Sequence, residues 1–347
     1  MKLNKDKLFA LSHGAVRAVE DQGKVRFYRF TEEQQNLYKT HRIPSYYLKT
    51  CAPAGIRLEF RTDSKSLFLK VNIPFATTRS YFSIDVCVNG ELLGSINNYS
   101  GMDMTGDYTQ KAYPLGSFEK GFALGDGEKT ISIFMPWSVP AEIEELSIDD
   151  GAFAEPVFRN KKILAFGDSI TQGCDALIPS KHYIVKLSDL LQADVYNKAV
   201  GGECFFPQLA ECTQTDLFPD YIFVAYGTND WNRVALDTFR SNCKAFYSIL
   251  SAKYPGAKIF ALTPVWRKDH ETPRNCGAFA GIADYIEEVA AELDNVTCVN
   301  GWELVPHDEK MYGDLRLHPN DHGFAHMANN LYKAIKNLTG DFHAANG

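Results

Sequence analysis

Short apolar runs separated by turn residues characterise the chain between about Arg26 and Gly151. Runs of four to eight apolar or alternating residues bounded by turn signals are typical of β-strands. Turn sequences here include 89-NG-90 and 125-GDG-127. The runs lie at 56–60, 66–73, 81–88 and 130–136. Many short strands joined by tight turns form two packed sheets, so this half predicts a jelly-roll-like β-sandwich.

A different pattern begins after the linker-like segment 150–162, where short apolar runs alternate with helical periodicity. The predicted strands lie at 163–166, 193–197, 221–227, 258–264 and 296–300. The predicted helices lie near 180–192, 235–253, 278–294 and 321–338. Buried strands that alternate with helices indicate a parallel sheet covered on both faces. We therefore predict an all-β sandwich domain over 1–155 and an α/β domain over 156–347.

Length and charge limit the classes of function. A chain of 347 residues exceeds the length at which one hydrophobic core stops growing, which agrees with two domains. The net charge of -7 disfavours a nucleic-acid partner. The N-terminus lacks the apolar core of a secretory signal and no run spans a membrane, so we expect a cytoplasmic protein that binds no membrane. The eight cysteines are scattered singly and are expected to be thiols. The sequence does not indicate the oligomeric state.

Polar residues follow several predicted strands at their carboxyl ends, where open parallel sheets bind ligands. Ser169 follows the first strand in 165-AFGDSITQGCD-175, and Gly202 follows the second in 197-NKAVGGE-203. Asn229 follows the third strand in 226-YGTNDW-231, and His318 precedes the last helix in 312-YGDLRLHPNDHGF-324. Four distant segments thus bring a hydroxyl, a backbone amide, a carboxamide and an imidazole to one edge of the sheet. These groups are the parts of an acyl-transfer site.

Each of these residue types has a chemical role in acyl transfer. A serine hydroxyl attacks an ester only when a base accepts its proton, and His318 is the candidate base for Ser169. The attack creates an oxyanion, which preorganised hydrogen-bond donors stabilise. The candidate donors of this oxyanion hole are the backbone N–H groups of Ser169 and Gly202 and the side-chain amide of Asn229.

Taken in order, GDSIT, Asn-x-x-x-Gly-Gly, GTND and HPND resemble the motifs of the SGNH (GDSL-type) hydrolase family. The resemblance covers about 160–340 and implies a flavodoxin-like α/β/α fold and esterase activity. It also implies that Ser169 is the nucleophile, that Gly202 and Asn229 are oxyanion-hole donors, and that His318 is the base. The first half, with 54-AGIRLEFRTDSKSL-67, is similar to the N-terminal domain of some carbohydrate-esterase-like members. That similarity implies an O-acetylated carbohydrate as substrate.

One position departs from the family pattern. The triad aspartate of the family usually lies three residues before the histidine, but Leu315 occupies that position and the nearest acid is Asp314. Either the turn carries one extra residue and Asp314 orients His318, or a backbone carbonyl orients the imidazole and the site is a dyad. We expect the first arrangement.

Structural alternatives exist for the individual residues. Asp168 and Ser169 are preferred N-cap residues and fit a helix start, and Gly201-Gly202 fits a strand-exit turn. Trp231 and Trp266 are expected to form a substrate-binding wall, with buried packing as the alternative. The spacing of His322 and His326 suits one ligand pair, but no third ligand is evident, so no metal and no cofactor are predicted.

These observations predict a serine esterase that works through an acyl-enzyme on a small-molecule or saccharide ester, with an O-acetylated carbohydrate favoured. Within the enzymes, the alternatives are a short-chain acyl esterase, a thioesterase or a lysophospholipase. The alternative from another class is a non-catalytic carbohydrate-binding protein on a hydrolase fold, for which Leu315 in place of aspartate is the sequence hint. Aromatic residues near predicted strand ends in the first half, Tyr81, Tyr99 and Trp137, are candidates for sugar contacts.

Overall fold

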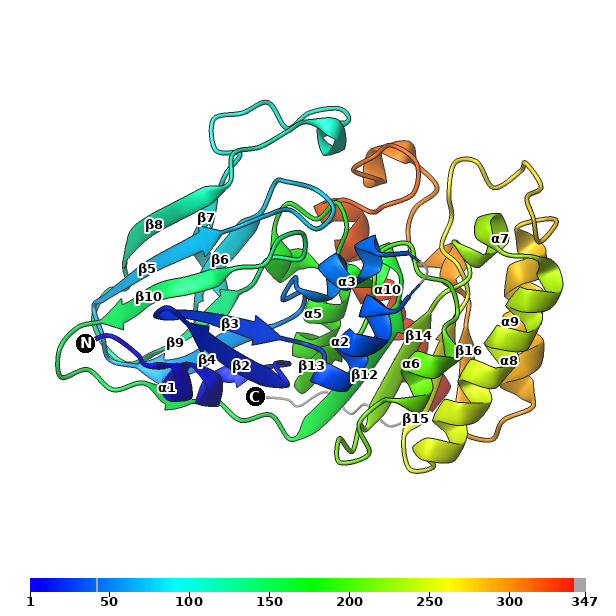
Figure 1. Cartoon of the computed structure of the whole chain (residues 1–347), viewed down its shortest axis with the longest axis horizontal. Coiled ribbons are helices and arrows are strands. Elements are labelled where there is room, and N and C mark those ends of the chain that lie inside the picture. The colour runs from blue at the N-terminus through cyan, green and yellow to red at the C-terminus, as the bar shows by residue number, and fades with distance from the viewer. Residues whose placement is uncertain (42, 340–347) are drawn as a thin grey trace.

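The chain forms two parts that lie side by side, a β part and an α/β part (Figure 1). The computed structural model describes residues 1–41 and 43–339, so the last eight residues of the predicted 156–347 domain lie outside the described residues. We call the strands β1–β11 together with the segments that connect them the β part, and the region from β12 to α10 the α/β part. No helix among the described residues is both long enough and apolar enough to cross a membrane.

The β part is a sandwich of two antiparallel sheets, as the sequence predicts. One sheet has the order β1-β4-β9-β6-β7 with β11 paired to β4, and the other has the order β2-β3-β10-β5-β8. Alternate residues of β5, from Leu67 to Ile73, are buried and pack in the core between the sheets. The strands are β1 (Ser12–His13), β2 (Arg17–Asp21), β3 (Lys24–Tyr28), β4 (Arg57–Thr62), β5 (Ser66–Ile73), β6 (Ser83–Val88), β7 (Glu91–Asn97), β8 (Gly116–Ala123), β9 (Lys129–Phe134), β10 (Glu142–Ile148) and β11 (Glu155–Pro156).

The α/β part contains a five-stranded parallel sheet with the order β13-β12-β14-β15-β16. Numbered within this part, the strand order is 2-1-3-4-5, which is the flavodoxin-like order. The order of the strands reverses at β12, because β13 lies on one side of it and β14, β15 and β16 lie on the other. The crevice at such a point is where this fold binds ligands. The strands are β12 (Lys161–Gly167), β13 (Ala193–Asn197), β14 (Tyr221–Ala225), β15 (Lys258–Leu262) and β16 (Val296–Val299).

Helices cover both faces of this sheet, which confirms the predicted α/β/α arrangement. Along β14, Phe223 packs in the cluster that contains α5 and α10, whereas Ile222 and Val224 pack in the cluster that contains α8 and α9. The helices of this part are α4 (Ser169–Gln172), α5 (Tyr183–Leu190), α6 (Pro207–Glu211), α7 (Asp230–Arg233), α8 (Leu236–Lys253), α9 (Ala280–Ala291) and α10 (Asp321–Thr339).

Three helices lie in the N-terminal half, where the sequence pattern predicts strands alone. They are α1 (Lys5–Ala10), α2 (Glu32–Lys39) and α3 (Ser45–Thr50). A capping box of Thr31 and Gln34 begins α2, and this signal in 31-TEEQ-34 is readable in the sequence. Tyr38 and Tyr46 of these helices belong to the same hydrophobic cluster as Phe246 of α8. The N-terminal half therefore contributes directly to the core of the α/β part.

The buried side chain of Arg29 links the two parts by hydrogen bonds. Arg29 is fully buried and donates hydrogen bonds to the carbonyl oxygens of Ala52 (2.8 Å), Asn197 (3.0 Å) and Ala199 (2.6 Å). Strand β11 also spans the predicted boundary between residues 155 and 156 while it pairs with β4. The division into 1–155 and 156–347 stays a proposal, and the contacts across it are extensive.

Candidate active site

Ser169 lies at the sharp turn between β12 and α4. Gly167 allows this turn because an added Cβ would lie 2.4 Å from Thr171 Oγ1 and 2.9 Å from the Ala225 carbonyl oxygen. Asp168 caps the helix, since its Oδ1 accepts the Ile170 N–H at 3.0 Å. The capping role therefore falls to Asp168, and the Ser169 side chain faces a different partner.

That partner is His318, which joins Ser169 and Asp314 in one hydrogen-bonded chain. Ser169 Oγ lies 2.8 Å from His318 Nε2, and His318 Nδ1 lies 2.8 Å from Asp314 Oδ2. A carboxylate only accepts hydrogen bonds, so Nδ1 carries the ring proton and Nε2 is left to accept the serine O–H. This is the geometry of an activated serine nucleophile.

The turn that holds Asp314 carries one extra residue, and Leu315 occupies it in the left-handed conformation with φ of 55°. Asp314 Oδ1 accepts the backbone N–H groups of Arg316 (3.0 Å), Leu317 (2.7 Å) and His318 (3.1 Å). These three donors lock the carboxylate so that its other oxygen faces the imidazole. The structure thus brings Asp314 to His318 in the first of the two arrangements expected from the sequence.

The charges of this site favour a basic imidazole. Burial lowers the pKa of His318, but the hydrogen bond that Nδ1 donates to Asp314 and the negative charges of Asp175 and Asp314 outweigh burial, so the pKa is raised above its ordinary value. Burial raises the pKa of Asp314, yet the bond to His318 and the backbone N–H groups hold that pKa well below its usual range. The ring is therefore poised to take up a proton.

The loop after β13 presents the Gly202 amide. Gly202 has φ of 87°, and an added Cβ would lie 2.9 Å from Arg233 Nη1, so both conformation and space require glycine. Lys49 Nζ donates to the Gly201 carbonyl at 2.5 Å, and Arg233 Nη1 donates to the Gly202 carbonyl at 2.9 Å. The Tyr46 hydroxyl also donates to the Gly202 carbonyl. Side chains from α3 and α7 therefore hold this loop.

Two of the three candidate oxyanion donors are unengaged. Within residues 1–41 and 43–339, neither the Ser169 N–H nor the Gly202 N–H donates a hydrogen bond. The amide of Asn229 is engaged, because Nδ2 donates to Asp168 Oδ2 and to the Glu203 carbonyl, each at 3.2 Å. The role of Asn229 as a donor stays a prediction.

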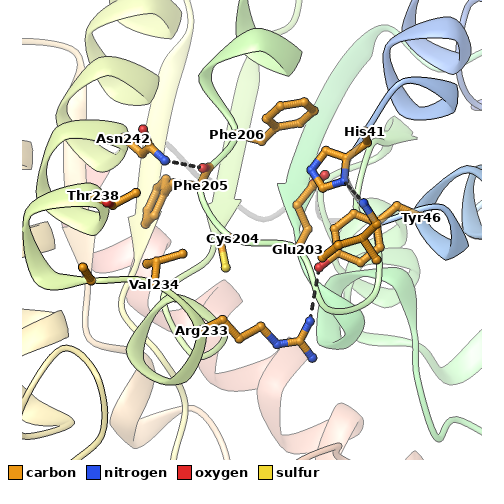
Figure 2. A pocket seen from close by; sticks show the side chains of 12 residues that line it. His41, Tyr46, Glu203, Cys204, Phe205, Phe206, Arg233, Val234, Thr238 and Asn242 are labelled. Carbon is orange, nitrogen blue, oxygen red and sulfur yellow. Dashed lines mark hydrogen bonds between the residues drawn. The ribbon is translucent and has the colours of Figure 1, made fainter.

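A cavity of about 390 Å³ reaches the carbonyl side of this loop (Figure 2). Tyr46 and Arg233, which both donate to the Gly202 carbonyl, line it. Figure 2 shows Arg233 directed at the Tyr46 hydroxyl, with the His41 ring stacked on Tyr46 and Phe206 edge-on to His41. The residues that line it do not include Ser169, Gly202 or His318, so the cavity adjoins the loop and not the catalytic side chains.

The two tryptophans of the expected substrate wall lie in different environments. Trp231 is fully buried, donates its indole N–H to the Gly277 carbonyl at 2.8 Å and packs against Phe279. The packing alternative therefore describes Trp231, which has no face open to a substrate. Trp266 is partly buried, with His307 stacked on its ring at a centroid distance of 5.8 Å.

Sequence reasoning missed four polar side chains around the site: Lys49, Tyr46, Arg79 and Asp175. Asp175, Asp314 and His318 hold ligand atoms within 4.8 Å of one another, and among the described residues this is the group that could hold a metal ion. Each of the three already has hydrogen-bond partners in the protein. The expected absence of a metal stays a prediction. No local periodicity marks these four residues, because each acts across more than 90 residues of chain.

Comparisons with known proteins agree with this geometry. Residues 165–326 match the model of the GDSL-like Lipase/Acylhydrolase family. A search of curated protein sequences finds no match.

Three solved structures illustrate the similarity of the fold. A salicylyl-acyltransferase from a tetracycline biosynthetic pathway is 21% identical over 94% of both chains, with a TM-score of 0.75. A protein described as a GDSL-like lipase from Bacteroides ovatus is 17% identical over 98% of both chains, with a TM-score of 0.74. An acetyl xylan esterase from Butyrivibrio proteoclasticus is 14% identical over 99% of both chains, with a TM-score of 0.62. The similarity therefore includes the β part as well as the α/β part.

The matched region contains the turn that carries Ser169 and the loop that carries His318, and its sheet has the flavodoxin-like strand order. Residues 165–326, which carry Ser169, Gly202, Asn229, Asp314 and His318, are therefore similar to the GDSL-like Lipase/Acylhydrolase family.

Proposed function

We propose that this protein is a serine esterase that deacetylates an O-acetylated carbohydrate through an acyl-enzyme. The observation that carries the proposal is the chain of two 2.8 Å hydrogen bonds from Ser169 Oγ through His318 to Asp314. Ser169 is the nucleophile, His318 is the general base and then the general acid, and Asp314 orients the imidazole.

The reaction has two halves. The Ser169 O–H gives its proton to His318 Nε2 while Oγ bonds to the ester carbonyl carbon, and the π electron pair moves to the carbonyl oxygen. The tetrahedral intermediate then collapses, and the imidazolium returns the proton to the departing alcohol oxygen. Water next repeats both steps on the acyl-enzyme, and the acid is released with Ser169 restored.

The unengaged N–H groups of Ser169 and Gly202 are the proposed donors to the oxyanion. Such donors act best when they are already in place, and the loss of one typically costs about 3–4 kcal/mol of transition-state stabilisation. Asn229 is the proposed third donor and would exchange one of its two 3.2 Å hydrogen bonds for the oxyanion.

The similarity of the whole chain to an acetyl xylan esterase supports an acetylated carbohydrate as substrate. A carbohydrate esterase of family two from Clostridium thermocellum, solved in complex with cellohexaose, also has this fold, with 17% identity and a TM-score of 0.61. Trp266, which is partly exposed, is the proposed aromatic contact for a sugar.

The test compares the wild type with Ser169→Ala on acetylated xylo-oligosaccharide, on a nitrophenyl acetate and on a nitrophenyl octanoate. We expect Ser169→Ala to lower turnover by roughly a millionfold, as is typical when a triad nucleophile is removed. Ser188→Ala is the matched control, since it removes a buried hydroxyl whose one hydrogen bond within the described part of the chain goes to the Val185 carbonyl. Residual activity in Ser169→Ala near that of wild type would exclude Ser169 as the nucleophile.

The same assay separates the substrate classes. Preference for the acetylated oligosaccharide supports the proposal, and preference for the octanoate indicates a lysophospholipase-like or longer-chain esterase. Binding of the oligosaccharide without turnover of any ester would indicate a non-catalytic carbohydrate-binding protein. The hydrogen-bonded Asp314 argues against that outcome, because the extra residue Leu315 leaves the carboxylate at the imidazole.

A further inference from the structure

A second carboxylate lies at the same imidazole nitrogen that Asp314 contacts. Asp175 Oδ2 is 3.5 Å from His318 Nδ1, and Asp314 Oδ2 is 2.8 Å from it. The Asp175 side chain is fully buried, whereas Asp314 retains slight exposure. A buried carboxylate without partners would be costly, so the groups that surround Asp175 decide what it does.

Those groups come from the β part. Arg79 Nε donates to Asp175 Oδ1 at 3.1 Å, and the Tyr81 hydroxyl donates to the same oxygen at 2.9 Å. The Tyr108 hydroxyl donates to the Asp175 backbone carbonyl at 2.6 Å. A cation and a hydroxyl thus bond Oδ1, while Oδ2 faces both Arg79 Nη2, which donates to it at 3.5 Å, and His318 Nδ1, also at 3.5 Å.

The local backbone is shaped for this arrangement. Asp175 has φ of 72°, a left-handed conformation that Asp and Asn adopt far more readily than most residues. It follows the short helix α4 that begins with Ser169. The short segment 169–175 therefore carries both the proposed nucleophile and a carboxylate next to the proposed base.

We propose that Asp175 is a second positioning residue for His318, and that Arg79 of the β part moderates its negative charge. This inference rests on the proposed serine esterase function and deepens it. The β part then takes part in catalysis through the imidazole, in addition to any contact with substrate.

The physical argument concerns the imidazolium that forms when His318 takes the serine proton. Asp314 and Asp175 both lie at Nδ1 and stabilise that cation, while the positive charge of Arg79 opposes it. Tyr81 and Tyr108 are neutral donors to Asp175, and Asp168 is a further buried acid whose charge interacts with His318. The balance between the charges of Asp175 and Arg79 should therefore set the pH at which His318 becomes protonated and can no longer act as a base.

The two residues have opposite effects on the pH profile of kcat/KM. His318 must be neutral to act as a base, so activity falls on the acidic side as the ring is protonated. Asp175→Asn removes an anion and should move the acidic limb to lower pH by about one unit. Arg79→Gln leaves the anion unopposed and should move the same limb to higher pH by up to about one unit.

The controls separate charge from damage to the fold. Asn suits the left-handed conformation at position 175 and keeps an acceptor for Arg79 and Tyr81, so Asp175→Asn is a mild change. Arg79→Lys keeps the charge and should return the limb toward its wild-type position. Asp85→Asn removes an equally buried carboxylate, which accepts the Ser180 N–H at 2.9 Å, and should leave the limb unmoved.

A second readout does not depend on activity. The imidazole of His318 is titrated by NMR in the full-length Ser169→Ala protein, with its signal assigned by comparison with His318→Gln. The midpoint should fall in Asp175→Asn and rise in Arg79→Gln. Shifts of this kind without ester hydrolysis by wild type would overturn the esterase proposal alone. Midpoints and limbs that do not move, or that move in the same direction for both variants, would overturn the role of Asp175 and Arg79.

Discussion

At the scale of single residues, the position of Leu315 explains how an altered motif still builds the site. A left-handed residue shortens the path of the turn, so the acid four residues before His318 reaches the ring that the usual acid reaches from three residues away. Three backbone N–H groups then hold the other carboxylate oxygen. The chemical group and its orientation are preserved although the spacing is not.

Asp314→Asn tests this assignment. The amide can present an N–H to Nδ1, which favours the wrong imidazole tautomer, and losses of roughly 10⁴ in turnover occur where this happens. We expect a strong loss of turnover with a small change in melting temperature, because the oxygen that accepts the three N–H groups remains. Equal turnover in the variant and the wild type would remove Asp314 from the site and favour a dyad.

At the scale of elements, helices α2 and α3 support the loop after β13. Lys49 and Tyr46 of α3 bond the carbonyls of Gly201 and Gly202. The Gly201 carbonyl and the Gly202 N–H share one planar peptide, so a bond to the first fixes the direction of the second. A helix of the N-terminal half thus aims a proposed oxyanion donor.

Lys49→Met should therefore lower kcat more than it raises KM. The donor stays present but is held less firmly, so we expect a loss of roughly tenfold in kcat, below the 10²–10³ that follows complete removal of a donor. Lys39→Met is the control, since Lys39 is an exposed lysine on α2 whose Nζ donates to Asn36 Oδ1 and lies 5.4 Å from the centre of the Tyr47 ring, away from the Gly201 and Gly202 carbonyls. A variant with wild-type kcat would show that the loop keeps its orientation without Lys49.

Glu203 connects α2 to the same loop and gives a prediction about pH. Burial raises the pKa of Glu203 from 4.5 to about 8, although Tyr38 and Tyr226 donate hydrogen bonds that favour the charged form. The folded state therefore holds this proton more tightly than the unfolded state does. Its contribution to stability is complete below about pH 4.5 and is lost as pH rises toward 8.

Glu203→Gln should weaken this dependence. The measurement is the melting temperature at pH 5 and at pH 8, where the wild type should lose more stability between the two values than the variant. Glu211→Gln, which changes an exposed side chain, should behave like the wild type. An unchanged slope in Glu203→Gln would mean that Glu203 is ionised in the folded protein throughout this range.

At the scale of the whole molecule, the β part and the α/β part share their interface with the active site. Phe30, Tyr38 and Tyr46 are buried in the cluster that covers one face of the parallel sheet. All three aromatic residues of the first half expected to contact sugars serve the same interface, because Trp137 donates to the Ala176 carbonyl and Tyr99 to the Leu177 carbonyl, each at 2.8 Å, and Tyr81 donates to Asp175.

The isolated region from 156 onward should consequently fail to fold. Loss of one buried aromatic side chain costs about 3–5 kcal/mol, so losing the three above approaches the 5–15 kcal/mol of a whole domain. Expression of this region should yield insoluble or unfolded protein by circular dichroism. A soluble, cooperatively folded fragment would contradict this and would allow a direct measurement of how far the β part selects the substrate.

Local patterns in the sequence determined the elements and the order of the motifs. Apolar residues that repeat every second position predict a strand, and those that repeat every three to four positions predict a helix. Strand β13 begins and ends where this pattern predicts. Because parallel strands end at one edge of a sheet, that order also predicted that Ser169 and His318 would meet, and they do so across 149 residues. The capping box of α2 was equally local and was overlooked.

Only the tertiary structure decided which side chains from the β part reach the site. Arg79 and Tyr81 lie 96 and 94 residues from Asp175, and nothing in their own segments marks them as partners of a carboxylate. A leucine does not favour the left-handed conformation, so residue type alone did not predict it for Leu315. The hydrogen bonds that Asp314 accepts stabilise that conformation. Such contacts depend on how the sheets of the two parts pack together, because packing, and not local periodicity, sets which buried charges face one another.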